Sequence, residues 1–277
     1  MRIKTVKAQR LSNFNSIGRD YDVIYLKNSS ELHDIANNFI ILGNGTNSLF
    51  VSEQSNPFVS LKEMTAVKFL NSYTIEAEAG ILLPNLITQL KKKSLGGLEF
   101  TYPVPATLGA AVYQNFGAFG KEIGFMVKKV TVFDKTEQRF YSIDTHNTAE
   151  YFFYRDSYFK QHQLVITNIT MELPTLSEHE VNDQLNAISN KRQSIYPLKK
   201  TLGSIFLNTP ECSAGKLLDE AGLKGKVHNG AYVSEQHANI IINKSASSED
   251  IYDLIQLMKT SVKKKANISL KEEIFIY

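Results

Sequence analysis

Three residues have side chains and sequence neighbours that could serve binding or catalysis: Arg155, Ser204 and Glu273. The Arg155 guanidinium, next to Tyr154, could stack on rings at the surface or bind a carboxylate or enolate oxygen. Ser204 follows a glycine, but no histidine or aspartate at triad-like spacing would make it a nucleophile. Glu272 and Glu273 enter an apolar strand, where alternation turns only one of them inward. Taken singly, each residue also has an ordinary explanation. Arg155 could be a surface cation, Ser204 a loop hydroxyl and Glu273 a solvated charge.

A glycine-containing turn provides a second kind of signal, because successive backbone N–H groups in such a turn can hold an anion. The turn follows an apolar strand and contains Gly43, Asn44, Gly45, Thr46, Asn47 and Ser48. It matches neither the G-x-G-x-x-G dinucleotide motif nor a P-loop. A pyrophosphate would suit this turn, and a tight polar turn without a ligand explains the segment equally well.

Small residues crowd the segment 96–120, which indicates that its backbone lies close to something flat or large. A closely packed helix and turn is the alternative, but Thr107 and Asn115 add hydrogen-bonding groups that packing alone would not need. We therefore favour a ligand-binding interpretation. The residues of this segment expected to bind the ligand are Pro105, Thr107, Gly109, Ala110, Asn115, Gly117 and Ala118.

Strands and helices alternate along the whole chain, which predicts a mixed α and β fold. The first strands are followed by the glycine turn, and capping signals mark several helix starts. Expected strands cover residues 24–26, 39–42, 73–79, 130–133 and 164–166, with an extended segment over 268–277. Expected helices cover residues 31–37, 178–192 and 214–221. A further helix is expected to begin at Pro84 with Leu86, Ile87 and Leu90 on one face, and a last one to follow the cap at 247–250.

Composition narrows the class of protein. The 277 residues include 43% hydrophobic and 21% charged ones, as in ordinary globular proteins, and suffice for two or three domains. A net charge of +3 is too small to indicate a nucleic-acid partner. One cysteine excludes an internal disulfide and a multi-cysteine metal site, so no metal is expected. Without a signal-peptide pattern or a membrane-length apolar run, we expect a soluble, cytoplasmic protein.

In this order, the segments resemble the UDP-N-acetylenolpyruvoylglucosamine reductase family. The family's glycine turn is matched by residues 43–47, and its Gly-Leu-Glu-Phe and Asn-x-Gly-Ala-Tyr-Gly motifs by 97–120. Further motifs are matched by Tyr154 to Ser157, by the block that starts at Gly203, by 213–225 and by 233–239. The likeness covers nearly the whole chain and is weakest in the first forty residues.

The resemblance implies an α+β fold of the vanillyl-alcohol-oxidase type, with two FAD-binding subdomains at 1–65 and 66–175. A substrate domain would follow at 176–277, with its last strand returning to the active site. FAD would be bound non-covalently, with its pyrophosphate over the glycine turn, and NADPH would be the hydride donor. The implied substrate is UDP-N-acetylglucosamine enolpyruvate, which is reduced in peptidoglycan synthesis by a protein expected to be monomeric. On this interpretation, Gly45→Val should lower flavin occupancy more than the stability of the apoprotein.

The resemblance also assigns roles to individual residues. Arg155 and Glu273 would stabilise the charge at the substrate carboxylate, and Ser204 would donate a proton to C2. The substrate-binding positions implied are Tyr154, Asn208, Gln236 and His237. Another flavin-dependent oxidase or dehydrogenase of this fold, or an inactive flavin-binding relative, is the alternative. The presence of Arg155, Ser204 and Glu273 together argues against both.

The sequence departs from the family pattern at several places. Asn44, Ala106 and Ala110 replace family glycines and add side chains near the expected cofactor. Leu207 stands where a lysine is usual and Phe275 where an arginine is usual, and Thr209 is inserted before Pro210. The segment between Leu173 and Lys191 is too short for the tyrosine-bearing insertion of one subtype. The chain therefore resembles the shorter subtype.

Overall fold

A computed structural model describes residues 1–195 and 200–277 of the chain. Two compact units are found within it. Unit 1 consists of Met1–Lys4, Asp22–Asn44 and Asn56–Asn190, and unit 2 of Thr5–Tyr21, Gly45–Ser55 and Lys191–Tyr277. The division into 1–65, 66–175 and 176–277 stays a prediction, because the observed units group the segments 5–21 and 45–55 with the C-terminal part of the chain.

Unit 1 contains two sheets. The first has the order β1-β2-β5-β3, in which β5 pairs in parallel with both β2 and β3. Its strands are β1 (Arg2–Lys7), β2 (Asp20–Tyr25), β3 (Ile40–Ile41) and β5 (Phe58–Ser60), of which residues 5–7 and 20–21 are grouped with unit 2. The expected helix at 31–37 is instead a 3₁₀ helix, Ser29–Asp34, so its position was predicted but its type was not. The glycine turn follows β3 directly, as predicted.

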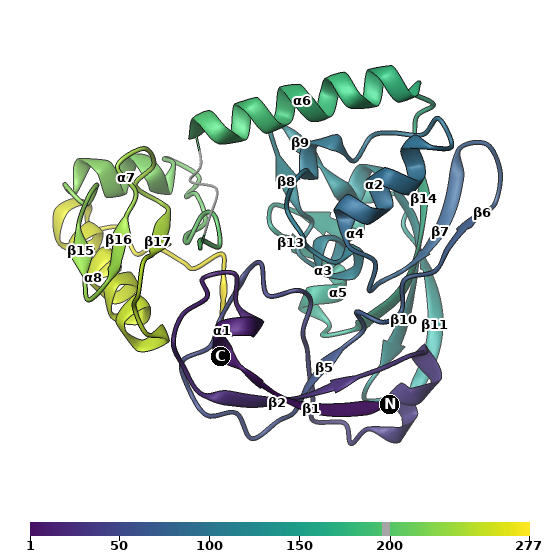
Figure 1. Cartoon of the computed structure of the whole chain (residues 1–277), viewed down its shortest axis with the longest axis horizontal. Helices are drawn as coiled ribbons and strands as arrows, with labels where there is room; N and C mark the ends of the chain where they lie inside the picture. The colour runs from purple at the N-terminus through teal and green to yellow at the C-terminus, as the bar shows by residue number, and fades with distance from the viewer. Residues whose placement is uncertain (196–199) are drawn as a thin grey trace. The chain divides into compact units, whose positions relative to one another are not determined.

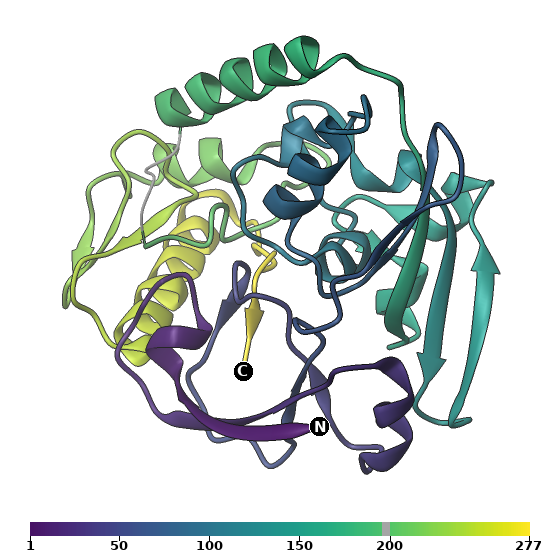
Figure 2. The same ribbon diagram turned by 45° about the vertical axis from the view of Figure 1, so that its right-hand side comes forward.

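The second sheet of unit 1 is antiparallel, with the order β11-β10-β14-β7-β6. Figures 1 and 2 show α2 and α3 on one face of this sheet. The strands are β6 (Val67–Phe69), β7 (Thr74–Glu78), β10 (Val127–Asp134), β11 (Arg139–Asp144) and β14 (Val165–Glu172). The helices of unit 1 are α2 (Leu83–Lys91), α3 (Leu108–Tyr113), α4 (Thr148–Tyr151), α5 (Tyr158–Gln161) and most of α6 (Glu178–Ile195).

Amphipathic patterns explain how these elements form one core. In α2, Leu83, Leu86, Ile87 and Leu90 are buried on the face that the sequence predicted, and Pro84 lies in the first turn. Two 3₁₀ helices, Glu99–Thr101 and Ile123–Met126, complete the packing around α3. The short hairpins that carry polar site residues are β8 (Gly117–Ala118) with β9 (Lys121–Glu122), and β12 (Phe152–Phe153) with β13 (Asp156–Ser157).

Unit 2 packs α8 against a three-stranded sheet and α7. The sheet order is β15-β16-β17, with β15 (Val227–His228), β16 (Ala231–Val233) and β17 (Ile241–Asn243). The helices are α1 (Ala8–Leu11), α7 (Ala214–Glu220) and α8 (Ser248–Ala266). Ser213 caps α7 and a Ser247–Asp250 capping box opens α8, both as predicted.

The chain ends in unit 2 as a strand. Of the expected extended segment 268–277, only β18 (Phe275–Ile276) forms a strand, which pairs in parallel with β4 (Ser48–Leu49).

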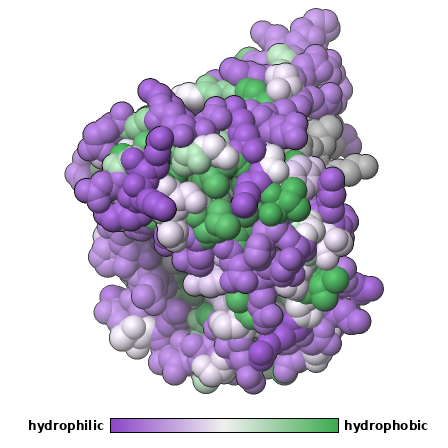
Figure 3. Space-filling view, turned by 90° about the vertical axis from the view of Figure 1, so that its left-hand side faces the viewer, coloured by the Kyte–Doolittle hydropathy of each residue, from purple (hydrophilic) through white to green (hydrophobic). Residues whose placement is uncertain are grey.

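Figure 3 shows a largely hydrophilic face of the molecule on which a small group of apolar residues is exposed. Among the described residues, no helix combines the length and the apolar character that a membrane span requires.

Candidate active site

The glycine turn leaves its backbone donors available. Residues 44–47 donate no backbone hydrogen bond to another described residue, so their N–H groups can bind an anion. Gly43 is closely surrounded, since an added Cβ would lie 2.8 Å from the Ala110 Cβ and 3.1 Å from the Thr107 hydroxyl oxygen. Within unit 1, the start of the turn therefore lies against the small-residue segment.

Gly45 has a structural requirement of its own. Its φ is +68°, and an added Cβ would lie 1.6 Å from the Leu11 carbonyl oxygen. A side chain at position 45 therefore clashes with the protein's backbone before any ligand is considered. The expectation that Gly45→Val lowers flavin occupancy more than the stability of the apoprotein is therefore replaced: the substitution should disrupt the fold itself. Ser48, also expected at the cofactor, is buried, and its carbonyl oxygen accepts a hydrogen bond from the Ser12 hydroxyl at 2.7 Å.

The small-residue segment packs closely on the rest of unit 1. Gly109 donates its backbone N–H to the Ala79 carbonyl at 2.8 Å, and an added Cβ would lie 2.7 Å from the Ala79 Cβ. Packing therefore accounts for this glycine, the alternative that the sequence left open. Gly120 differs, because its φ is +79° and nothing lies within 4 Å of an added Cβ. Backbone conformation, and not close packing, therefore accounts for glycine at position 120.

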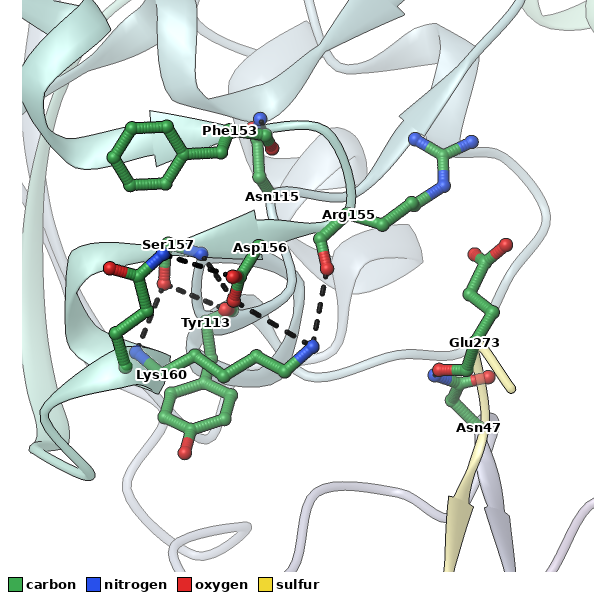
Figure 4. A network of polar contacts seen from close by, with 10 residues as sticks. Asn47, Tyr113, Asn115, Phe153, Arg155, Asp156, Ser157, Lys160 and Glu273 are labelled. Atoms are coloured by element: carbon green, nitrogen blue, oxygen red, sulfur yellow. Dashed lines mark hydrogen bonds and ion pairs between the residues drawn. The ribbon is translucent and has the colours of Figure 1, made fainter. Parts of the chain in front are cut away.

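The Asn115 side chain is committed to the protein. Asn115 is fully buried, and its amide nitrogen donates to Glu122 Oε2 and to the Phe153 carbonyl, both at 2.8 Å. Its side-chain oxygen accepts the Gly124 N–H at 3.1 Å. The expected contact of Asn115 with the cofactor is therefore not one that its side chain can make. Instead, this side chain joins β9 and the following 3₁₀ helix to the β12–β13 hairpin that carries Arg155; Figure 4 shows Asn115 beside Phe153 of that hairpin.

Arg155 has an unusual backbone conformation. Its φ is +54°, in the left-handed region that costs a non-glycine residue about 1–2 kcal/mol. Lys160 donates to the Arg155 carbonyl at 3.2 Å and lies 3.8 Å from Asp156, which stabilises the turn (Figure 4). The guanidinium lies 5.2 Å from the centre of the Tyr154 ring and 2.5 Å from where a Gly117 Cβ would be. Such strain is typical of functional sites, and Gly117 leaves room for the guanidinium.

Ser204 lies in unit 2 on an extended segment whose backbone is firmly held. It forms an isolated bridge with Ile240, and the Ile205 N–H donates to the Asn239 carbonyl at 2.9 Å. The Asn239 side chain accepts from the Phe206 N–H at 2.9 Å and donates to the Phe206 carbonyl at 2.8 Å. No hydrogen bond joins the Ser204 hydroxyl to another described residue. The hydroxyl is thus available for a substrate.

Glu272 and Glu273 are both half-buried and precede the strand Phe275–Ile276, so the expectation that only one of them turns inward stays a prediction. Glu272 pairs with Lys259 at 2.6 Å, and Phe206 forms an isolated bridge with Glu272. The Glu273 N–H donates to the Ile205 carbonyl at 2.8 Å, and Asn47 Nδ2 donates to the Glu273 carbonyl at 3.1 Å (Figure 4). Asn47 therefore fixes the backbone of Glu273 within unit 2.

The expected substrate-binding residues of unit 2 have varied surroundings. Asn208 and Gln236 are exposed, and the Asn208 side-chain oxygen accepts the Ala214 N–H at the start of α7, at 3.0 Å. His237 is half-buried, and its Nδ1 accepts the Asn239 N–H at 3.2 Å, which leaves the proton of the neutral ring on Nε2. Burial lowers the pKa of His237, and the positive charge of Lys224 lowers it further. A neutral histidine that can donate from Nε2 is therefore favoured.

The two units thus hold different parts of the expected site. Ser204 and Glu273 belong to unit 2, where backbone hydrogen bonds place their segments side by side, whereas Arg155 and Tyr154 belong to unit 1. The sequence analysis missed Asn239 and Lys62, whose partners lie 33 and 18 positions away in the sequence. The place of Asn239 in the matched block 233–239 was its one signal in the sequence.

Comparison with known proteins relates this chain to reductases over most of its length. Residues 30–139 match the family model described as FAD binding domain, and residues 196–277 match UDP-N-acetylenolpyruvoylglucosamine reductase, C-terminal domain. The reductase of Fusobacterium nucleatum is 31% identical over 99% of both chains, and that of Francisella tularensis 33% identical over 91% of both. A crystal structure of the Thermus caldophilus reductase matches with a TM-score of 0.85 and 26% identity, covering 100% of this chain and 99% of that one.

The fold and these matches define an FAD-binding α+β protein, which confirms the predicted fold class. The matches to reductases extend over both units of the chain. The chain belongs to the UDP-N-acetylenolpyruvoylglucosamine reductase family.

Proposed function

We propose that this chain is an FAD-containing, NADPH-dependent oxidoreductase that reduces the enolpyruvyl group of UDP-N-acetylglucosamine enolpyruvate to give UDP-N-acetylmuramate. The observation that carries this function is the likeness to a curated reductase over 99% of both chains. A likeness of this extent includes both units, and all three expected catalytic residues fall within it. The reaction belongs to peptidoglycan synthesis.

The residues present fit a bound FAD. The backbone N–H groups of residues 44–47 form a donor set for a pyrophosphate, and Gly43 lies so close to Ala110 that a side chain at position 43 would fill the available space. When bound, FAD supplies hydride that it has received from NADPH. Gly43 to Ser48 and the segment 105–118 are the proposed binding residues, with the Asn115 side chain acting on the loops rather than on FAD.

The chain's own residues are proposed to bind the substrate and move its proton. The Arg155 guanidinium binds the carboxylate of the enolpyruvyl group and, with Glu273, stabilises the negative charge that develops there. The Ser204 hydroxyl, which has no partner among the described residues, donates a proton to C2. Tyr154, Asn208, Gln236 and His237 are proposed to contact the rest of the UDP-sugar. His237 would do so as a neutral donor through Nε2.

The finer properties of the protein are part of the same proposal. We propose a cytoplasmic monomer that acts without nucleic acid or membrane, because its substrate is a soluble nucleotide sugar. Size-exclusion chromatography with light scattering, at concentrations up to those of crystallisation, tests the oligomeric state. A stable dimer would contradict the monomer without affecting the reaction.

The experiment that tests the function uses the purified protein, its absorbance spectrum and its product. A yellow protein that releases intact FAD on denaturation is expected, and it should oxidise one NADPH for each UDP-N-acetylglucosamine enolpyruvate consumed. Mass spectrometry should show a product heavier than the substrate by two hydrogens. A protein that contains FAD but oxidises NADPH only with oxygen would favour another flavoenzyme of this fold. A protein that binds FAD and reacts with neither would favour an inactive relative.

A further inference from the structure

Lys62 follows β5 in unit 1 and holds its amine beside the glycine turn. Its Nζ donates to Asn44 Oδ1 at 3.3 Å and lies 6.0 Å from the centre of the Tyr25 ring. The neighbouring Glu63 pairs with Arg2 instead. No carboxylate of a described residue lies within 4.0 Å of the Lys62 nitrogen. The groups that the amine contacts directly, the Asn44 amide and the Tyr25 ring, are both neutral.

Asn44 holds this amine in place. Its Nδ2 donates to the Pro105 carbonyl at 2.8 Å, which fixes the orientation of the amide and turns Oδ1 toward Lys62. One side chain thus connects the turn, the start of the small-residue segment and the end of β5. Asn44 stands where the family pattern has glycine, so this connection comes from a departure of this chain and not from the shared motif.

Neutral partners offset only part of the free-energy cost of removing water from a half-buried ammonium group. Burial lowers the pKa of Lys62 for this reason. Such a group gains most from an anion, and Asn44 of the same unit also has a backbone N–H that donates no hydrogen bond to another described residue. The surroundings of Lys62 are therefore better suited to a complex with a phosphate than to the protein alone.

We propose that Lys62, oriented by Asn44, is an additional contact for a phosphate group of the dinucleotide cofactor. This inference rests on the proposed function, because it uses the cofactor of that function. Where the family pattern has a glycine, this chain has Asn44, whose side chain orients the Lys62 ammonium as a charged hydrogen-bond donor for the phosphate. Lys62 would bind the pyrophosphate and not the isoalloxazine ring. Loss of Lys62 should therefore weaken the binding of FAD but not of riboflavin, which has no phosphate.

Lys135 provides a matched control. It is also a half-buried lysine of unit 1 whose pKa is lowered by burial, and it also lies over an aromatic ring, that of Phe39, at 5.2 Å. Its Nζ donates to the Phe39 carbonyl at 3.3 Å, away from the glycine turn. Lys135→Met therefore removes a similar charge from a similar environment without touching Asn44. A general effect of losing a lysine would appear equally in both variants.

The test titrates flavin-free protein with FAD and, separately, with riboflavin, following flavin fluorescence at several salt concentrations. Lys62→Met should weaken FAD binding by about tenfold or more, the loss of one charge-assisted hydrogen bond. Riboflavin binding, which involves no phosphate, should change less than about twofold, and FAD binding should become less sensitive to salt. Lys62→Arg should keep most of the affinity. Asn44→Gly should weaken FAD binding in the wild type and add nothing in the Lys62→Met background.

Several results would overturn the inference. If Lys62→Met binds FAD as tightly as wild type or as Lys135→Met, Lys62 does not contact the phosphate. If FAD and riboflavin lose affinity equally, Lys62 acts only on the fold of the binding region, and melting temperatures of the flavin-free variants would show the same loss. Lys62→Gln repeats the test should the methionine variant be unstable. A wild-type protein that binds no FAD would overturn the proposed function and this inference together.

Discussion

The two halves of the candidate site use their backbone and side chains in opposite ways. Around the glycine turn, the side chains of Asn44 and Asn115 are bonded to the protein, and the backbone N–H groups of residues 44–47 are left for a ligand. Around Ser204, the backbone is bonded on both sides and the hydroxyl is left. A cofactor that stays bound suits a backbone cradle, whereas a reacting substrate needs side chains that can exchange a proton.

This difference has a consequence for substitutions. A side chain added at Gly45 or Gly109 in the first region alters the shape of the protein itself, because the added Cβ would overlap Leu11 or Ala79. A substitution at Ser204 removes the hydroxyl group, while the backbone of this segment keeps its hydrogen bonds. The predictions below follow from this contrast, from the largest expected effect on the folded protein to the smallest.

Gly45→Ala should destabilise the protein severely. Its φ of +68° and the Leu11 carbonyl, 1.6 Å from an added Cβ, leave no room for a methyl group, so a loss above about 4 kcal/mol is expected. Gly120→Ala is the matched control, since its φ is +79° but nothing lies within 4 Å. It should cost about 1–2 kcal/mol from backbone strain alone. Urea unfolding of the flavin-free proteins measures both, and equal losses would contradict the clash.

Asn239→Ala should also destabilise the protein, because it leaves the buried Phe206 N–H and carbonyl without their partners. The expected cost is about 2–4 kcal/mol in urea unfolding, with a slower reaction of the substrate because the Ser204 segment is no longer held. Gln236→Ala, an exposed neighbour, should change stability by less than about 0.5 kcal/mol. Retention of full activity by a destabilised Asn239→Ala would show that this segment need not be held in place.

Gly117→Ala should displace the Arg155 guanidinium more than it disturbs the fold. The added Cβ would lie 2.5 Å from an Arg155 side-chain nitrogen, which is flexible and can move away, and 3.1 Å from the Lys121 carbonyl oxygen, which must shift slightly. We expect a small decrease in melting temperature but a reaction with substrate slower by about tenfold to hundredfold. In a double-mutant cycle, Gly117→Ala should add little to Arg155→Ala. Additive effects would show that Gly117 acts on something other than Arg155.

The smallest expected effect is a pH dependence of stability from His237. Burial lowers the pKa of the folded-state His237 below its usual value of about 6.5, so the unfolded chain binds a proton more readily. The contribution of this group is therefore fully present above about pH 6.5 and is lost as the pH falls through that value toward the lowered pKa. His237→Gln should flatten the decrease in unfolding free energy between pH 7 and pH 5. An unchanged slope in the variant would contradict this account.

Much of the fold could be predicted from local signals. The helix at Pro84 and the caps at Ser213 and Ser247 depend on residues within one or two turns, and all three were placed correctly. Strand β11 and the sheet of unit 2 were missed, because their short segments carry little periodicity. The helix expected at 31–37 formed as a 3₁₀ helix, a distinction that the apolar pattern alone does not make.

The candidate site was less accessible to sequence reasoning. Its residue types could be selected from motifs, but the partners of those residues depend on contacts between distant elements. Asn115 was selected for its hydrogen-bonding groups, and the structure shows those groups bonded to Glu122 and Phe153. The amide of Asn44 likewise bonds to Pro105 and Lys62, which no spacing in the sequence indicates. Whether a polar group remains free for a ligand can be judged only when all its neighbours are known.

Stopped-flow absorbance of the Ser204→Ala variant tests the central claim most directly, because it follows both halves of the reaction separately. Reduction of the flavin by NADPH involves the cofactor region and should stay within a few-fold of wild type. Reoxidation by UDP-N-acetylglucosamine enolpyruvate needs the Ser204 proton and should slow by at least about 10³-fold, with Ser204→Cys recovering part of the loss. Reoxidation of the alanine variant at nearly the wild-type rate would contradict the account, and Glu273 would then be the next candidate for the proton donor.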